Sequence, residues 1–154
     1  MQRREVLKAG VGLGVFGTLI ASGLVQPRLA HAARQMENAF QAKSLEEALK
    51  AVGASGAAAS NDIVLTAPDI AENGAVVPIE LESKLPNTEM IALFVEKNPN
   101  ALSAVFHFTP EALPRVKTRV KMGQSSDVVA VVKAGGKYYM TKKEVKVTLG
   151  GCGG

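Results

Sequence analysis

The chain has 154 residues and a mass of 16.1 kDa, with one cysteine, no tryptophan and a formal net charge of +4. This length allows one domain with a short extension. A single cysteine excludes an internal disulfide framework, a multi-cysteine zinc site and an iron-sulfur cluster held within this chain. That cysteine, Cys152, lies two residues from the end of the sequence, with a pair of glycines on each side.

The first 32 residues have the three parts of a cleavable export signal. Adjacent arginines, Arg3 and Arg4, precede an apolar stretch over residues 9–25, and the small residues Ala30 and Ala32 follow it. The motif Arg-Arg-Glu-Val-Leu-Lys that this pair opens resembles the twin-arginine signal, which exports folded proteins across the bacterial inner membrane. We therefore predict cleavage after Ala32 and a mature protein in the periplasm.

A permanent membrane helix is the alternative interpretation of this segment. The apolar stretch is short and rich in glycine, and it ends in an Ala-x-Ala site rather than a basic stop sequence. These features favour a removable signal over a stable membrane anchor. Without residues 1–32 the chain keeps 14 basic and 13 acidic side chains, a net charge of +1, so nucleic acid and anionic membranes lose their support as partners.

The mature chain is predicted to begin with a helix from Arg34 to Val52. Ser44 and Glu47 have the spacing of a capping box, and Gly53 is placed to end the helix. Residues 54–61 are small and polar, which is typical of a linker. The apolar stripe of the helix consists of Leu45, Ala48, Leu49 and Val52.

From residue 63 onward the apolar pattern has the period of two that β-strands show. Seven short strands separated by turn residues predict an all-β fold, an immunoglobulin-like β-sandwich. The Cys-Trp-Cys marker of true immunoglobulin domains is absent, so this prediction depends on the number and spacing of the strands. The expected strands are Ile63–Ala67, Ala75–Ser83, Met90–Lys97, Ser103–Thr109, Arg115–Met122, Asp127–Lys133 and Lys137–Leu149, the last bent or split.

Four parts follow from this order. They are the signal over residues 1–32, a helix and linker over 33–61, the β-sandwich over 62–149 and a tail over 150–154.

Charge is unevenly divided along the chain. Residues 33–114 hold 5 basic and 11 acidic side chains, whereas residues 115–154 hold 9 basic and 2 acidic ones.

One predicted strand concentrates the cations on a single face. In Arg115–Met122 the alternation places four cations on one face and Val116, Val120 and Met122 on the other. A solvated strand face that discourages edge pairing is the favoured interpretation. A docking face for an acidic partner is the alternative, to which Lys142, Lys143 and Lys146 contribute only if the fold brings the two strands together.

The residues offer little catalytic chemistry. Once the signal is removed, His107 is the only imidazole, and we interpret it as an ordinary strand residue. The carboxylates that recur at Glu80 and Glu82, and at Glu46 and Glu47, lack the further ligands of a metal site. No phosphate loop or cofactor motif is present, so we predict no catalytic residues, no metal and no cofactor.

The tail remains as the candidate functional segment. Gly150, Gly151, Gly153 and Gly154 accept many backbone conformations, so we predict a narrow, flexible arm that carries Cys152 about 10 Å beyond the last strand and into a deep cleft of another protein. Nothing near the thiol in sequence would activate it, which indicates a carried thiol rather than a catalyst. An incidental free cysteine, or one that only joins two copies, is the alternative.

The ending Gly-Gly-Cys-Gly-Gly after Val145–Leu149, joined to a twin-arginine signal, resembles the SoxY family, the sulfur-carrier subunits of the bacterial sulfur-oxidation (Sox) system. Residues 63–79 also resemble that family's first strands. The resemblance implies a periplasmic carrier that holds thiosulfate-derived sulfur covalently on Cys152 and is not itself an enzyme.

The resemblance also implies partners. They are a SoxZ-like subunit in a heterodimer, the haem enzyme SoxAX that couples thiosulfate to the cysteine, the dimanganese hydrolase SoxB and, where present, the sulfane dehydrogenase SoxCD. Two other classes stay open at this point. One is a periplasmic interaction or structural sandwich whose Cys152 only forms a disulfide with a partner, and the other is a carrier activated at its terminal glycine carboxylate, against which the export signal argues.

Overall fold

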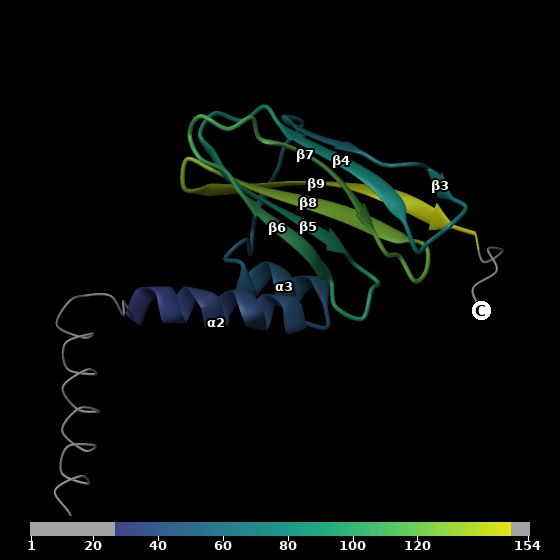
Figure 1. Cartoon of the computed structure of the whole chain (residues 1–154), viewed down its shortest axis with the longest axis horizontal. Helices are drawn as coiled ribbons and strands as arrows, with labels where there is room; N and C mark the ends of the chain where they lie inside the picture. The colour runs from purple at the N-terminus through teal and green to yellow at the C-terminus, as the bar shows by residue number, and fades with distance from the viewer. Residues whose placement is uncertain (1–26, 149–154) are drawn as a thin grey trace, which may run out of the picture. The chain divides into compact units, whose positions relative to one another are not determined.

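The computed structural model describes residues 27–148, and the predictions for the arginine pair and for the cysteine tail lie outside the described residues. Figure 1 shows the strands of the β-domain stacked in layers. The elements are α2 (Pro27–Gln41), α3 (Leu45–Ala51), β1 (Ala58–Ala59), β2 (Ile63–Thr66), β3 (Ile70–Ala71), β4 (Val77–Ser83), β5 (Thr88–Val95), β6 (Leu102–His107), β7 (Arg115–Val120), β8 (Ser126–Ala134) and β9 (Lys137–Val147).

The chain divides into two units, with the boundary between Gln35 and Met36, inside α2. Of the first unit the structure describes only residues 27–35, which form the first turns of that helix. The second unit contains every strand, α3 and the end of α2. No helix among residues 27–148 is long and apolar enough to cross a membrane.

The prediction of a single helix over Arg34–Val52 was wrong in one respect, because the chain forms two helices there, α2 and α3. Ser44 has an extended backbone, with φ −129° and ψ 156°, and its Oγ accepts a hydrogen bond from Glu47 N at 3.2 Å. The Glu47 carboxylate in turn accepts from Lys43 N at 3.2 Å. The capping interaction is therefore confirmed, and it starts a new helix because an N-cap residue cannot be helical itself.

Gly53 ends α3 as the sequence predicts. Its φ of +80° places it in the left-handed region, which glycine adopts at low cost. Gly53 N donates to Lys50 O at 3.1 Å, and Ala54 N donates to Leu49 O at 2.8 Å. These two bonds form a Schellman motif, which satisfies the last carbonyl groups of the helix.

The strands form two sheets. One has the order β1-β9-β8-β5-β6, with β3 also paired to β9, and the other has the order β2-β4-β7. All seven predicted strands are present within a few residues of the expected bounds, and β9 runs unbroken for 11 residues. The pattern did not predict β1, which lies in the expected linker, or β3, which follows the expected turn at Pro68.

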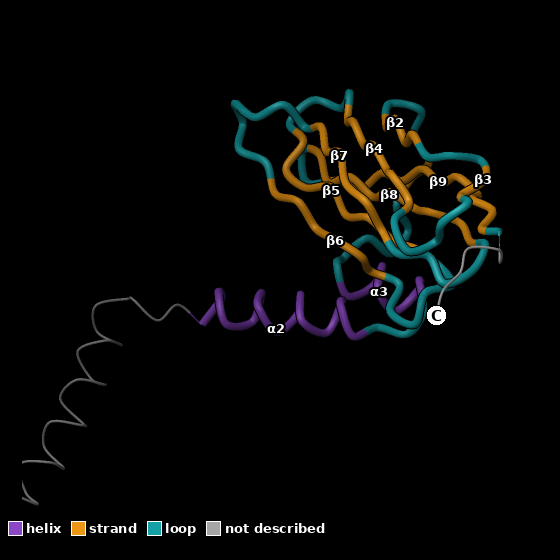
Figure 2. Tube along the Cα trace, turned by 45° about the vertical axis from the view of Figure 1, so that its right-hand side comes forward, coloured by secondary structure: helices purple, strands orange, loops and turns teal. Residues whose placement is uncertain are grey.

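Strands β5 and β8 lie side by side in the larger sheet (Figure 2). They form the centre of the second unit because both of their faces are buried. Alternate residues such as Leu93 and Val132 face the smaller sheet and join the core between the sheets. Phe94 and Val131 lie on the other face and pack with Ala39 and other residues of α3 and the end of α2. The second unit therefore has two cores separated by one sheet.

Strands β8 and β9 form a hairpin in which Ala134 pairs with Lys137. The two residues between them, Gly135 and Gly136, have φ values of +55° and +75°, as a tight two-residue hairpin turn requires. This turn sets the register of β9, the last strand, and so fixes where the chain leaves the sheet.

Candidate functional site

The predicted site residues Gly150, Gly151, Cys152, Gly153 and Gly154 lie outside the described residues, so the site is built here from the chain that leads to them. That chain is β9, followed by Thr148. One edge of β9 pairs with β8 along most of its length, and the other edge pairs in parallel with β1 and with β3. The strand is therefore held on both edges.

The β3 segment holds the last residues of β9 on one edge. Lys146 N donates to Asp69 O at 3.0 Å, and Thr148 N donates to Ala71 O at 3.1 Å. The hydroxyl of Thr148 also donates to Ala71 O at 3.4 Å. The backbone is therefore hydrogen-bonded as far as Thr148, one residue beyond the end of β9.

Ser125 holds the opposite edge. The ladder between β8 and β9 ends at the pair Ser126 and Val145, so Val147 has no β8 residue opposite it. Val147 N instead donates to Ser125 Oγ at 2.8 Å, and that hydroxyl donates to Val147 O at 3.5 Å. A side chain thus takes the place of a strand.

Gly74 completes this end of the domain because its backbone approaches its neighbours closely. Its carbonyl oxygen accepts a hydrogen bond from Met122 N at 2.6 Å. A Cβ atom at Gly74 would lie 2.4 Å from Met122 O and 2.9 Å from Val147 Cγ1. Only glycine allows these loops to pack against the last residue of β9.

Two of the three β9 lysines that we expected as a possible extension of the basic face, Lys142 and Lys143, are paired locally. Lys143 Nζ lies 3.0 Å from an Asp69 carboxylate oxygen and donates to Ala67 O at 2.5 Å. Lys142 Nζ donates to Asp127 at 2.8 Å, and this contact raises the pKa of Lys142. Because β9 and β7 belong to different sheets, these lysines are not strand neighbours of the β7 cations.

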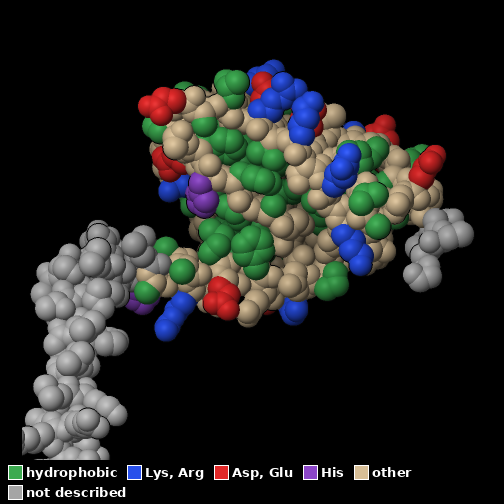
Figure 3. All heavy atoms as spheres, in the orientation of Figure 1, with side chains coloured by type: hydrophobic (Ala, Val, Ile, Leu, Met, Phe, Trp, Pro, Cys, Tyr) green, Lys and Arg blue, Asp and Glu red, His purple; other side chains and the backbone are tan. Residues whose placement is uncertain are grey.

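The predicted alternation in β7 is confirmed, with Val120 in the core and the cations exposed. Figure 3 shows Lys and Arg side chains gathered with acidic ones over the region of β4 and β7. Glu80 lies opposite Lys117 in the register. Arg115 Nε donates to the Glu80 carboxylate at 2.8 Å, and Lys117 Nζ lies 3.2 Å from the same group.

These contacts change the ionisation of the pair. The hydrogen bond from Arg115 and then that from Lys117 lower the pKa of Glu80, and Glu80 raises the pKa of Arg115. The outer face of the smaller sheet, with its groove of about 770 Å³ beside Pro78 and Arg119, is therefore a mixed surface on which Arg115 and Lys117 are paired with Glu80. This favours the solvated-face interpretation over a purely basic docking face.

Neither His107 nor the carboxylates named from the sequence form a catalytic or metal-binding cluster among the described residues. His107 is the last residue of β6 and is exposed. Among the described residues no three His, Cys, Asp or Glu side chains gather as metal ligands would.

The sequence analysis did not identify Asp69, Ala71, Gly74 and Ser125, because the segments that contain them have the composition of turns.

The fold and the site define a class of protein: a small two-sheet β-domain whose last strand is fastened on both edges and leads directly to a segment with a single cysteine. A family model described as "Sulfur oxidation protein SoxY" matches residues 48–152, a stretch that ends at that cysteine. The chain belongs to the SoxY family, as the resemblance predicted.

A solved structure of a relative supports this assignment. The chain is 38% identical to the sulfur carrier protein SoxY from Chlorobium limicola f thiosulfatophilum, with 73% of this chain and 98% of that chain covered and a TM-score of 0.63. Because that relative is a sulfur carrier protein, the prediction of a carrier rather than an enzyme is confirmed at the level of the family.

A second likeness concerns the fold alone. The superoxide reductase (neelaredoxin) from Ignicoccus hospitalis is 17% identical, with 57% of this chain and 81% of that chain covered and a TM-score of 0.51. No curated protein matches the chain.

Proposed function

We propose that the mature chain is a periplasmic sulfur carrier that holds thiosulfate-derived sulfur on Cys152 and presents it to the enzymes of the Sox system. The observation that carries the proposal is a family match that extends to Cys152, the only cysteine of the chain. A lone thiol suits this work because no internal partner can displace the cargo by forming a disulfide. The four glycines beside it provide the flexible arm.

The first step of the proposed cycle is an oxidation. The Cys152 thiolate and thiosulfate form a new sulfur-sulfur bond, the thiol proton is released to solvent, and two electrons pass to the haem enzyme SoxAX. The hydrolase SoxB then adds water across the bond to the terminal sulfonate, releasing sulfate and leaving a persulfide on the carrier. The carrier supplies the covalent anchor, and the enzymes supply the oxidant and the metal ions.

The export route and the partner belong to the same proposal. Arg3 and Arg4 direct the folded chain through the twin-arginine pathway, which carries with it a SoxZ-like subunit that lacks its own signal. An immunoglobulin-like interpretation of the fold is also part of the proposal. The strand order supports it, because β2-β4-β7 pack against β9-β8-β5-β6, as two sheets of such a sandwich would.

Intact-mass measurement tests the carrier function. Protein purified from the periplasm of thiosulfate-grown cells is expected to carry mass additions of sulfur and thiosulfonate that a reducing agent removes. The Cys152→Ser variant is expected to lose the whole series. Unmodified thiol alone, or a disulfide-linked dimer without additions, would instead support the alternative of an interaction module.

A relocated thiol is the matched control. The double variant Ser55→Cys with Cys152→Ser keeps one exposed thiol, since Ser55 is exposed on the loop after α3. Its thiol does not lie on the glycine arm, so we expect no thiosulfonate series on this variant. Equal loading of both thiols would contradict a specific carrier role for Cys152.

A further inference from the structure

We infer that Ser125, together with the backbone of Asp69–Ala71, forms a clamp that fixes the point at which the cysteine segment leaves the domain. Ser125 is then a positioning residue for delivery of the cargo. The inference rests on the proposed carrier function, but its structural part can be tested without it. We call these residues the arm-root clamp.

The first argument is that the ladder alone cannot hold the end of β9. The final residues of a chain's last strand are usually among the least stable parts of a sheet. Here β8 pairs no further than Val145, three residues short of Thr148. Without Ser125, Val147 N would have no partner on this edge, and only its bond to Ser125 Oγ at 2.8 Å continues the pattern.

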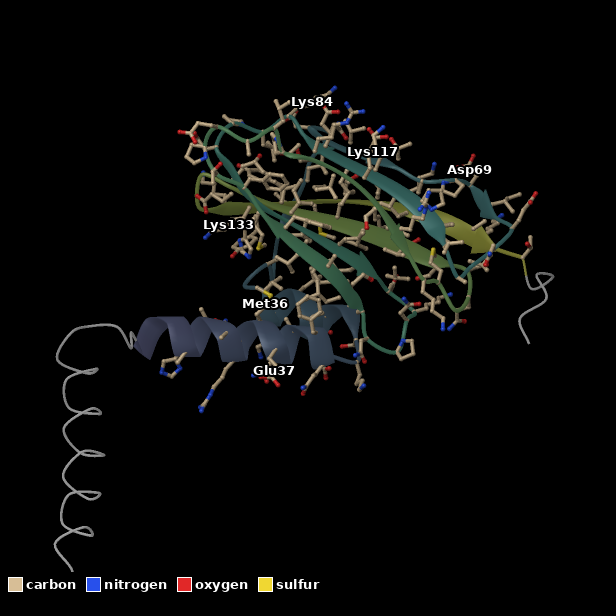
Figure 4. The ribbon with its side chains drawn as sticks, viewed as in Figure 1. Met36, Glu37, Asp69, Lys84, Lys117 and Lys133 are labelled. Carbon is tan, nitrogen blue, oxygen red and sulfur yellow. The ribbon has the colours of Figure 1, made fainter. Side chains whose placement is uncertain are left out.

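The second argument is that the opposite edge is fastened as well, so that the end of β9 is held from both sides. Lys146 N and Thr148 N donate to carbonyl groups of the β3 segment, as a parallel strand would require. Asp69 is tied to β9 a second time, because its carboxylate pairs with Lys143. Figure 4 shows Asp69 on the side of the β-domain where β9 ends.

The bonds alternate in a way that a chance contact would not produce. Even-numbered residues of this stretch donate towards β3 and the odd-numbered Val147 donates towards Ser125, as successive residues of a strand do. Gly74 closes the arrangement, since its backbone packs against Val147 Cγ1. The backbone is thus held on both edges as far as Thr148.

The clamp determines how far the thiol can extend. Cys152 lies four residues beyond Thr148, which allows an extended span of about 14 Å. Loss of the Ser125 bond would leave the β3 segment alone to hold this end of β9, and the release of Val147 and Thr148 that then becomes easier would add two residues to the arm and about 7 Å to its span. The volume that the thiol samples would then increase, and its effective concentration at a partner's cleft would fall about two- to threefold.

Spin labelling tests the structural part. Cys152 is the only cysteine, so a nitroxide can be placed there and a second one at Lys84→Cys, an exposed position on the β-domain. We expect Ser125→Ala to broaden the distance distribution and to speed hydrogen exchange of the Val147 amide, while the Val131 amide in central β8 stays protected. Ser125→Thr restores the hydroxyl and should restore both measurements.

A partner-dependent rate tests the positioning part. Loading of Cys152 with thiosulfate by the coupling enzyme, followed by intact mass, should be two- to threefold slower in Ser125→Ala and normal in Ser125→Thr. The reaction of Cys152 with a small thiol reagent should be equal in all variants, because the clamp does not touch the thiol. Ser103→Ala, a half-buried serine of β6, is the matched control and should change nothing.

The outcomes separate the two proposals. An unchanged distance distribution in Ser125→Ala overturns the clamp, whatever the function of the chain. A broader distribution with an unchanged loading rate overturns the positioning role alone. Absence of any thiosulfate adduct on the wild-type chain contradicts the proposed function while leaving the spin-label result valid.

Discussion

The two sheets differ in how many of their faces the rest of the molecule covers. The sheet that contains β5 and β8 has the smaller sheet on one face and the helices α3 and the end of α2 on the other. Within residues 27–148 the smaller sheet is covered on one face, and its outer face carries the ion pairs around Glu80. The cysteine segment follows β9, a strand of the doubly covered sheet, so it extends from the better-packed part of the molecule.

Removal of a large side chain from the doubly covered sheet gives the largest expected effect. Phe94 is fully buried between β5 and the helices. Phe94→Ala should lower the free energy of unfolding by about 3–5 kcal/mol, through lost burial and the cavity left behind. Denaturant unfolding followed by circular dichroism measures this change.

Phe106→Ala is the matched control for that experiment, because the same side chain is only half-buried on the edge strand β6. Its loss should be clearly smaller than that of Phe94→Ala. Equal losses at the two positions would contradict the idea that cover on both faces concentrates stability in the central strands.

The packing of α3 against the sheet can be tested at Gly53. The expected loss of stability is smaller than that of Phe94→Ala. An alanine there must adopt a φ of +80°, and its Cβ would lie 3.2 Å from the hydroxyl oxygen of Tyr138. We expect Gly53→Ala to lower the free energy of unfolding by about 1–2 kcal/mol. Gly56 has the same φ but no atom within 4 Å of the added Cβ, so Gly56→Ala measures the backbone cost alone.

The difference between these two glycine variants reports the contact with Tyr138. A larger loss for Gly53→Ala than for Gly56→Ala is expected. The reverse order would show that the packing of α3 against β9 does not depend on this approach, and it would weaken the description of the helices as a fixed cover.

The sequence predicted those features that depend on local pattern. Strands such as β4 and β7 follow a period of two, β5 and β8 are apolar runs bounded by turn residues, and Ser44 and Gly53 mark the ends of α3 by their own chemistry. The strands β1 and β3 were missed because two residues cannot show a period. Both strands exist only because β9 provides an edge for them, which is a long-range property.

The residues of the candidate site also differ in whether the sequence alone reveals them. Cys152 stands out in the sequence because its glycine context is unusual, whereas Ser125 looks like any turn serine. Its bond to Val147 spans 22 residues and depends on the register of the β8–β9 hairpin. The pairing of Glu80 with Lys117 and Arg115 likewise required the register of β4 and β7, which no periodic pattern contains.

The smallest expected effect concerns the outer face of the smaller sheet. The pKa of Glu80 lies below its ordinary value of 4.5 because Arg115, and then Lys117, donate hydrogen bonds to its carboxylate. A lowered pKa in the folded state means that the ionised carboxylate stabilises the fold above the unfolded-state pKa, and that this contribution is lost as the pH falls through the folded-state value.

A carbon-detected NMR titration of Glu80 should therefore give a midpoint below 4.5. This midpoint should rise in Arg115→Gln and rise less in Lys117→Gln. The stability difference between wild type and Arg115→Gln should shrink with falling pH and with added salt, because the pair is exposed to solvent. An unchanged Glu80 midpoint in Arg115→Gln would mean that the outer face is not organised by these pairs, and the contrast between the two sheets would then be one of burial alone.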